Sequence, residues 1–206
     1  MIKAILFDAD GMLINTESFS VQYSRDFKVS QEKILPFFQN EFQLCLIGEA
    51  DLKKVIKPYL ALWQWNKSVD DFLQYWFKSE HRIDDRIVNV IHELRQKDIR
   101  CYLATNQEKY RTQYMRDEMG FAHVFDGIFS SAEAGSKKPS TEFFDYVFEM
   151  LPGLNKKDIV FWDDKEENVI AARDYGFQAE QYTSFEDFRG KIAELTDFST
   201  NFYIVR

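Results

Sequence analysis

Short apolar runs alternate with amphipathic stretches along most of the chain. The first run, at residues 3–7, ends at an acid and predicts a buried parallel strand whose carboxyl end carries Asp8. This alternation predicts an α/β layer fold with a mostly parallel sheet. Further strands are predicted at residues 99–104, 127–129, 158–162 and 177–182. Helices are predicted to begin near residue 84 and at residue 184, and to span about residues 108–119, 140–151 and 165–175.

From about residue 16 to residue 81 the pattern changes to long helical segments rich in aromatic side chains. Ser68 and Asp71 have the spacing of a capping box, which gives the acidic residues at this point a structural explanation. We therefore expect two units, a core of residues 1–15 and 82–206 and a helical insertion of residues 16–81.

Most aromatic side chains of the insertion are expected to pack together, because a small helical unit needs large side chains to form a core. Trp65 and Gln43 remain candidates for a ligand cleft, and Glu49 is a candidate in a specificity loop at residues 46–49. The residues assigned to packing are Phe37, Phe38, Phe42, Trp63, Phe72, Trp76 and Phe77.

The composition and charge of the chain limit its partners. A length of 206 residues with 45% hydrophobic residues allows a substantial core. A net charge of -8 without a basic cluster argues against nucleic acid as a partner. Cys45 and Cys101 provide no disulfide framework, and no apolar run is long enough for a membrane helix, so a cytoplasmic protein with no membrane partner is expected. A monomer or weak homodimer is expected.

Polar residues follow several of the predicted strands. Open α/β sheets bind ligands beyond the carboxyl ends of their strands, so residues at these positions are expected to form one site. They are Asp8 and Asp10, Thr105 and Asn106, Asp163 and Asp164, together with Lys138 in a loop just before a helix.

These residue types indicate phosphoryl-transfer chemistry. Two pairs of carboxylates in one cleft repel each other unless a cation neutralises them, and Mg2+ prefers oxygen ligands. The oxygens of a transferring phosphoryl group require a hydroxyl donor, backbone N–H groups and a cation, which Thr105 and Lys138 could supply. Each residue alone could be a helix cap or a solvated side chain, whereas the ordered set indicates a site.

The ordered set resembles the signature of the haloacid dehalogenase-like (HAD) hydrolase superfamily, in its phosphatase and phosphomutase branch. The four motifs appear as Asp8-Ala9-Asp10-Gly11-Met12-Leu13, Thr105-Asn106, Lys138-Pro139 and Asp163-Asp164. The resemblance covers nearly the whole chain. It implies a Rossmann-like core with a small helical cap of the C1 type inserted after the first strand.

The resemblance also implies a role for each acidic residue. Asp8 would be the nucleophile that forms an aspartyl phosphate, and Asp10 would be the general acid for the leaving alcohol and then the base for water. Mg2+ would be held by Asp8, the main-chain carbonyl of Asp10 and Asp164. Asp163 would be a direct or water-mediated ligand.

The activity implied is that of a Mg2+-dependent phosphohydrolase acting on a small phosphate monoester, with a sugar phosphate as one option. Thr105, Asn106 through its backbone N–H, and Lys138 would hold the phosphoryl oxygens. A sugar phosphomutase similar to beta-phosphoglucomutase has the same motifs and stays an alternative. Asp10 argues against a 2-haloacid dehalogenase, which lacks an aspartate at this position, and the intact motif residues argue against a non-catalytic binding protein.

Overall fold

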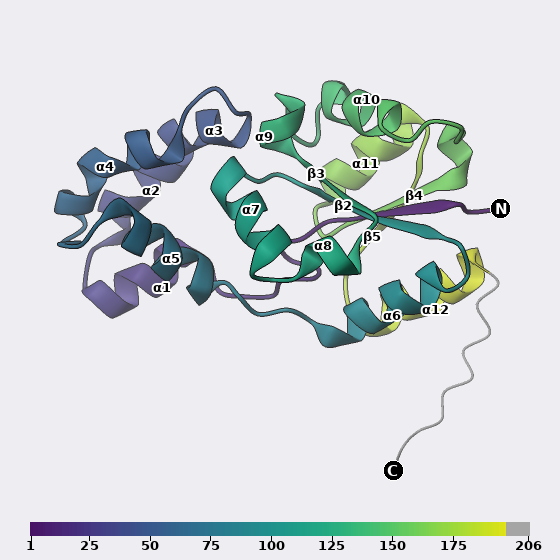
Figure 1. Cartoon of the computed structure of the whole chain (residues 1–206), viewed down its shortest axis with the longest axis horizontal. Helices are drawn as coiled ribbons and strands as arrows, with labels where there is room; N and C mark the ends of the chain where they lie inside the picture. The colour runs from purple at the N-terminus through teal and green to yellow at the C-terminus, as the bar shows by residue number, and fades with distance from the viewer. Residues whose placement is uncertain (197–206) are drawn as a thin grey trace, which may run out of the picture.

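The centre of the protein is a five-stranded sheet whose strands all run parallel (Figure 1). In this computed structural model, which describes residues 1–196, the strand order is β3-β2-β1-β4-β5, so the first strand of the chain is central. The predicted α/β fold is confirmed, and each predicted strand is present within one residue of its expected ends. The strands are β1 (Ala4–Phe7), β2 (Arg100–Thr105), β3 (Gly127–Ser130), β4 (Ile159–Asp163) and β5 (Gln178–Gln181).

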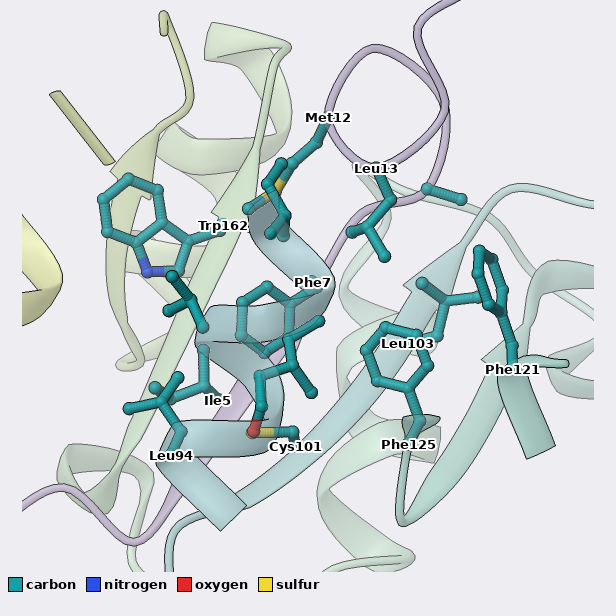
Figure 2. Close-up of a cluster of buried hydrophobic side chains, with 14 of the residues drawn as sticks. Ile5, Phe7, Met12, Leu13, Leu94, Cys101, Leu103, Phe121, Phe125 and Trp162 are labelled. Atoms are coloured by element: carbon teal, nitrogen blue, oxygen red, sulfur yellow. The ribbon is translucent and has the colours of Figure 1, made fainter. Parts of the chain in front are cut away.

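Side chains of the central strands alternate between two hydrophobic cores, one on each face of the sheet. Ile5 and Phe7 of β1 belong to the core drawn in Figure 2, together with Leu103 and Trp162 of the neighbouring strands. All four side chains are completely buried, as expected for strands covered on both faces. The helices over this face are α6 (Asp85–Arg95), α7 (Lys109–Asp117), α8 (Phe121–Val124) and α12 (Phe185–Leu195).

The opposite face of the sheet has a second core that contains Ala4 and Leu6 of β1. Phe143 and Phe144 pack here from the helix that follows Lys138, and this packing fixes the loop that carries the lysine. The elements on this face are α9 (Ser131–Ala134), α10 (Thr141–Glu149), η1 (Lys156–Asp158), a single 3-10 turn, and α11 (Glu166–Tyr175).

Five helices lie between β1 and α6 and pack around an aromatic cluster of their own (Figure 1). The expected capping box is present, since Ser68 Oγ accepts a hydrogen bond from Asp71 N at 3.0 Å and Ser68 N donates to Asp71 Oδ2. The helices are α1 (Phe19–Phe27), α2 (Gln31–Gln39), α3 (Glu41–Leu46), α4 (Leu52–Leu62) and α5 (Val69–Ser79). Within residues 1–196, no helix has both the length and the apolar character needed to cross a membrane.

Candidate active site

The sequence-predicted polar residues meet at the carboxyl edge of the sheet. Phe7 is paired with Leu103 and Trp162 in the flanking strands, so the chain segments that follow these residues end beside one another. They surround a pocket of about 200 Å³, called the small pocket below. It is lined by Asp8, Asp10, Gly11, Thr105, Asn106, Lys138, Asp164, Lys165 and Asn168.

Lys138 is the central cation of the small pocket and is only 3% exposed. Its Nζ donates to Asp8 Oδ1 at 2.7 Å, to Asp163 Oδ2 at 2.6 Å and to the carbonyl oxygen of Ala104 at 2.8 Å. Burial works against the charged ammonium, but the two carboxylates outweigh it and raise the pKa of Lys138. Lys138 therefore stays charged and holds the Asp8 carboxylate in one orientation.

The carboxyl group of Asp8 has an unusual environment. Burial raises the pKa of Asp8 to about 7, although the neighbouring Lys138 ammonium opposes this effect. A second cation beside the carboxylate would lower the pKa again and keep Asp8 ionised. The site is thus built so that the ionised form of Asp8 depends on positive charge in the pocket.

Asp163 lies beneath the small pocket and is fully engaged by protein donors. Its Oδ1 accepts from Lys165 N and from Asn168 Nδ2, both at 2.9 Å, while its Oδ2 accepts from Lys138. These contacts position the lysine. They favour the water-mediated option for Asp163 over direct coordination of a metal.

Asp164 supplies the carboxylate oxygen of the small pocket that could bind a metal ion. Its Oδ1 is buried and has no hydrogen-bond partner among residues 1–196. Carboxylate oxygens of Asp8, Asp163 and Asp164 all lie within 4.8 Å of one another. A buried, unpartnered carboxylate oxygen is costly unless a cation binds it. A set of oxygen donors with this spacing fits Mg2+.

Gly11 allows Asp164 to approach the turn after β1. The glycine has a φ of +86°, and a Cβ at this position would overlap the Asp164 carboxylate. We expect Gly11→Ala to weaken Mg2+ binding about tenfold or more, because the carboxylate must move, as measured by isothermal titration calorimetry. Gly153→Ala is the matched control, since Gly153 has a φ of +81° and open space around it. Equal Mg2+ affinity in both variants would contradict this assignment.

Thr105 and Asn106 form the side of the pocket at the end of β2. Thr105 is buried, and it is the last residue of the strand. The Asn106 side chain holds the loop of Lys138, because Nδ2 donates to the Lys138 carbonyl and Oδ1 accepts from Lys138 N, both at 2.9 Å. The side-chain amide of Asn106 is therefore occupied by the loop of Lys138.

Asp10 lies at the mouth of the small pocket, open to the cleft but surrounded by protein. Its Oδ2 accepts a hydrogen bond from Gln107 Nε2. Burial by the surrounding protein raises the pKa of Asp10, whereas Arg111 and the Gln107 hydrogen bond act in the opposite direction. A raised pKa suits a group that must hold and release a proton. The sequence predictions did not include Gln107 and Arg111.

A larger cleft of about 590 Å³ opens beside the small pocket and is called the large cleft below. The two share Asp10, Asn106, Lys138 and Lys165. Helices α1, α2, α3 and α5 form its other side, as they contribute lining residues from Phe19 to Phe77. One continuous space therefore leads from the acidic residues to the helical insertion.

The candidates in the helical insertion have mixed outcomes. Gln43 lines the large cleft and accepts a hydrogen bond from Lys137 Nζ. Trp65 is not a lining residue, because its ring packs against Phe27 and Phe72. Glu49 is exposed and lies outside the lining as well. Several aromatics assigned to packing do pack, but Phe38, Phe42, Trp76 and Phe77 also face the cleft.

Comparison with known proteins identifies the family. The model for the family described as haloacid dehalogenase-like hydrolase matches residues 5–179. The chain belongs to the haloacid dehalogenase-like hydrolases. The resemblance carried by the four motifs is thereby confirmed at the level of the family.

Curated relatives of this HAD-like hydrolase match about half of its length or less. The sesquiterpene phosphatase astK of Aspergillus oryzae is 35% identical over 95 residues, which are 46% of this chain and 48% of that protein. The putative HAD-hydrolase YfnB of Bacillus subtilis is 37% identical over 85 residues, which are 41% of this chain and 35% of that protein. The chain therefore spans about half, or less, of the length of these relatives.

Solved structures share the fold of this HAD-like hydrolase over nearly its whole length. The HAD family enzyme bt-2542 of Bacteroides thetaiotaomicron, in complex with magnesium and inorganic phosphate, has a TM-score of 0.78 at 20% identity. That match covers 93% of this chain and 99% of the other. The L-2-haloacid dehalogenase of Xanthobacter autotrophicus has a TM-score of 0.63 at 21% identity, covering 95% and 84%. At these identities the likeness establishes the Rossmann-like HAD fold.

Proposed function

We propose that the protein is a Mg2+-dependent phosphohydrolase that cleaves a small phosphate monoester through an aspartyl phosphate on Asp8. The observation that carries the proposal is the buried Lys138 bound to Asp8 and Asp163, beside the unpartnered oxygen of Asp164. The Lys138 ammonium fixes the Asp8 carboxylate that would attack. The unpartnered Asp164 oxygen provides a place for a second cation. This arrangement suits attack on a phosphoryl group.

The proposed reaction has two steps. A carboxylate oxygen of Asp8 attacks phosphorus, the bond from phosphorus to the alcohol oxygen breaks, and Asp10 donates its proton to that oxygen. Water then attacks the phosphorus of the aspartyl phosphate and gives a proton to Asp10, the bond from phosphorus to the Asp8 oxygen breaks, and inorganic phosphate leaves with the Asp8 carboxylate restored. Mg2+ held by Asp8, the Asp10 carbonyl and Asp164 would neutralise charge on the phosphoryl oxygens.

The residues that would hold the phosphoryl oxygens line the same small pocket. Thr105 would donate its hydroxyl, Asn106 its backbone N–H, and Lys138 would supply charge. The names of two related proteins support a phosphate substrate, since astK is a sesquiterpene phosphatase and bt-2542 binds magnesium and phosphate. The presence of Asp10 supports phosphoryl over halide chemistry, because an alcohol leaving group needs a proton.

The proposed function is tested by phosphate release from a panel of phosphate monoesters with Mg2+ and with a chelator. We expect release that requires Mg2+ and that falls by about 10²–10⁴-fold in Asp10→Asn, which removes the proton donor. Chloride release from a haloacid without phosphate release from any ester would overturn the proposal. Isomerised sugar phosphate that appears only with a bisphosphate activator would select the phosphomutase alternative.

We further propose that residues 16–81 act as a mobile cap on a core of residues 1–15 and 82–206. The two connections run side by side, because Asp84 N donates to the Leu13 carbonyl at 2.9 Å and Ile14 forms a bridge with Ile83. Paired connections of this kind can act as a hinge.

We expect amide exchange at residues 15–17 and 81–84 to slow at least about twofold when orthovanadate and Mg2+ are bound, because closure restrains both connections. Hydrogen exchange with mass spectrometry measures this, and the loop at residues 151–155, before β4, is the internal control. Unchanged exchange at both connections, with vanadate bound, would contradict a hinge at these residues.

A further inference from the structure

The large cleft is the space available to the alcohol part of an ester whose phosphate occupies the small pocket. Asp10 lines both spaces, and in the proposed reaction it is the group that protonates the leaving oxygen. The scissile bond must therefore lie at the boundary between them. Everything beyond the leaving oxygen extends into the large cleft, so the chemistry of its walls selects the alcohol.

The wall opposite the acidic residues is apolar. Four side chains line it, two from α2 at a spacing of three residues and two from α3 at a spacing of four, so each pair lies on one side of its own helix. None of the four is fully buried. They are Leu35, Phe38, Phe42 and Leu46.

Leu35 and Leu46 have no other evident role in packing. In the part of the chain that the structure describes, neither leucine belongs to any of the three hydrophobic clusters or packs against their edges. Apolar surface left beside a cleft of this size favours an apolar ligand, because covering it removes that surface from water. The buried rings of Trp76 and Phe77 also line the large cleft.

Polar groups on the helical side of the cleft already have partners within the protein. Gln43 Nε2 donates to the Phe38 carbonyl at 2.7 Å, and its Oε1 accepts from Lys137. Glu80 accepts hydrogen bonds from Phe19 N at 3.2 Å and from Trp76 Nε1 at 3.0 Å. A polyhydroxyl alcohol such as a sugar would lose hydrogen bonds to water here without gaining equivalent partners.

Arg111 is the buried exception among the polar lining residues, whereas Lys165 and Glu167 line the cleft from exposed positions on the core side. Its Nε and Nη2 are buried without a hydrogen-bond partner in residues 1–196, although Nη2 lies 3.7 Å from Glu80 Oε2. Glu80 thus faces the guanidinium group of Arg111. The buried groups left for a ligand are the Nε and Nη2 donors of Arg111, fewer than the hydroxyl groups of a sugar would need as partners.

We propose that the substrate is the monophosphate ester of a large, mainly apolar alcohol, whose carbon skeleton lies against the wall formed by Leu35, Phe38, Phe42 and Leu46. This inference rests on the proposed function and replaces the sugar phosphate as its substrate. A volume of about 590 Å³ lies within the range of roughly 300–1,000 Å³ that is typical of sites for drug-sized ligands.

The first test is a series of n-alkyl monophosphates from ethyl to octyl, compared with glucose 6-phosphate, below the micelle concentration and with Mg2+. Each added methylene group is expected to raise kcat/KM about three- to fourfold, because it removes apolar surface from water. Octyl phosphate should therefore exceed both ethyl phosphate and glucose 6-phosphate. A flat response to chain length, or a preference for the sugar ester, would overturn the inference.

A matched pair of variants on α3 locates the wall. Leu46→Ser is expected to lower the ratio of kcat/KM for octyl over ethyl phosphate about tenfold, because it removes apolar contact with the chain. Leu44→Ser places the same substitution on the same helix, where the side chain is exposed and outside the cleft, so the ratio should be retained. An equal change, or no change, in both variants would contradict this wall.

Binding separates a failure of this inference from a failure of the proposed function. If no ester of this series or of the wider panel releases phosphate, the proposed function is wrong, but the affinity of the cleft can still be measured. Calorimetry with the Asp8→Asn variant should give tighter binding of octyl phosphate than of ethyl phosphate by roughly 100-fold or more. Equal affinity for the two esters would overturn the apolar alcohol independently of catalysis.

Discussion

Replacing Asp8 by asparagine is expected to reduce kcat for phosphate release about 10⁴-fold or more. The amide has nearly the same shape as the carboxylate but cannot attack phosphorus to form an acyl phosphate. Lys138 keeps its contacts with Asp163 and the Ala104 carbonyl, so the pocket should retain its shape. The measurement is steady-state phosphate release with Mg2+, alongside circular dichroism to verify folding.

Asp117→Asn is the control for the loss of one carboxylate. Asp117 is exposed at the end of α7 and lines neither the small pocket nor the large cleft. Its kcat should stay within about twofold of the wild-type value, as expected for a surface position. Activity of Asp8→Asn at the level of this control would remove Asp8 from the reaction.

Replacing Lys138 by methionine is expected to lower the free energy of unfolding by about 3–5 kcal/mol and to abolish phosphate release. The side chain is almost wholly buried, and its removal leaves Asp8 and Asp163 as neighbouring buried carboxylates without their shared cation. Added Mg2+ should recover more stability in the variant than in the wild-type protein, because it is then the main neutralising charge. Chemical denaturation with and without Mg2+ measures both effects.

Lys137→Met is the matched control for this substitution. Lys137 is the adjacent residue, but it is only half-buried and its Nζ donates to Gln43 across the large cleft. Its replacement should cost about 1 kcal/mol or less. Equal losses in the two variants would show that the buried contacts of Lys138 carry no special stability.

The strands could be predicted from the sequence because a parallel sheet covered on both faces requires continuous apolar runs. The run before Asp8 and the run before Asp163 are buried throughout. The short helices α8 and α9 were not predicted, because four residues are too few to develop an amphipathic pattern. Their existence depends on packing against the sheet rather than on local preference.

The sequence was sufficient to predict those site residues that directly follow a strand. Strand ends determine where Asp8, Thr105 and Asp164 lie, so their convergence follows from the topology. Gln107 and Arg111 could not be found in this way, because they do not directly follow a strand, and the contact of Arg111 with the Phe77 carbonyl depends on how the helical insertion closes over the sheet edge. No spacing in the sequence encodes that closure.

The prediction for Trp65 failed because of a local turn. Gln64 has a φ of +61°, and Trp65 N donates back to the Leu60 carbonyl at 2.8 Å. This is the hydrogen bond of a Schellman-type helix end, which turns the chain back at Trp65. The ring packs beside Phe27 of α1 and Phe72 of α5 and does not line the large cleft.

The most direct test of the central claim is detection of the phosphoryl group on Asp8. The protein is mixed with Mg2+ and a reactive phosphate ester, quenched in acid within the first turnover, digested, and mapped by mass spectrometry. We expect one phosphoryl group on the peptide that contains Asp8, with none in Asp8→Asn. Phosphate release by the wild-type protein without any phosphorylated Asp8 peptide, and with full activity retained in Asp8→Asn, would contradict the account.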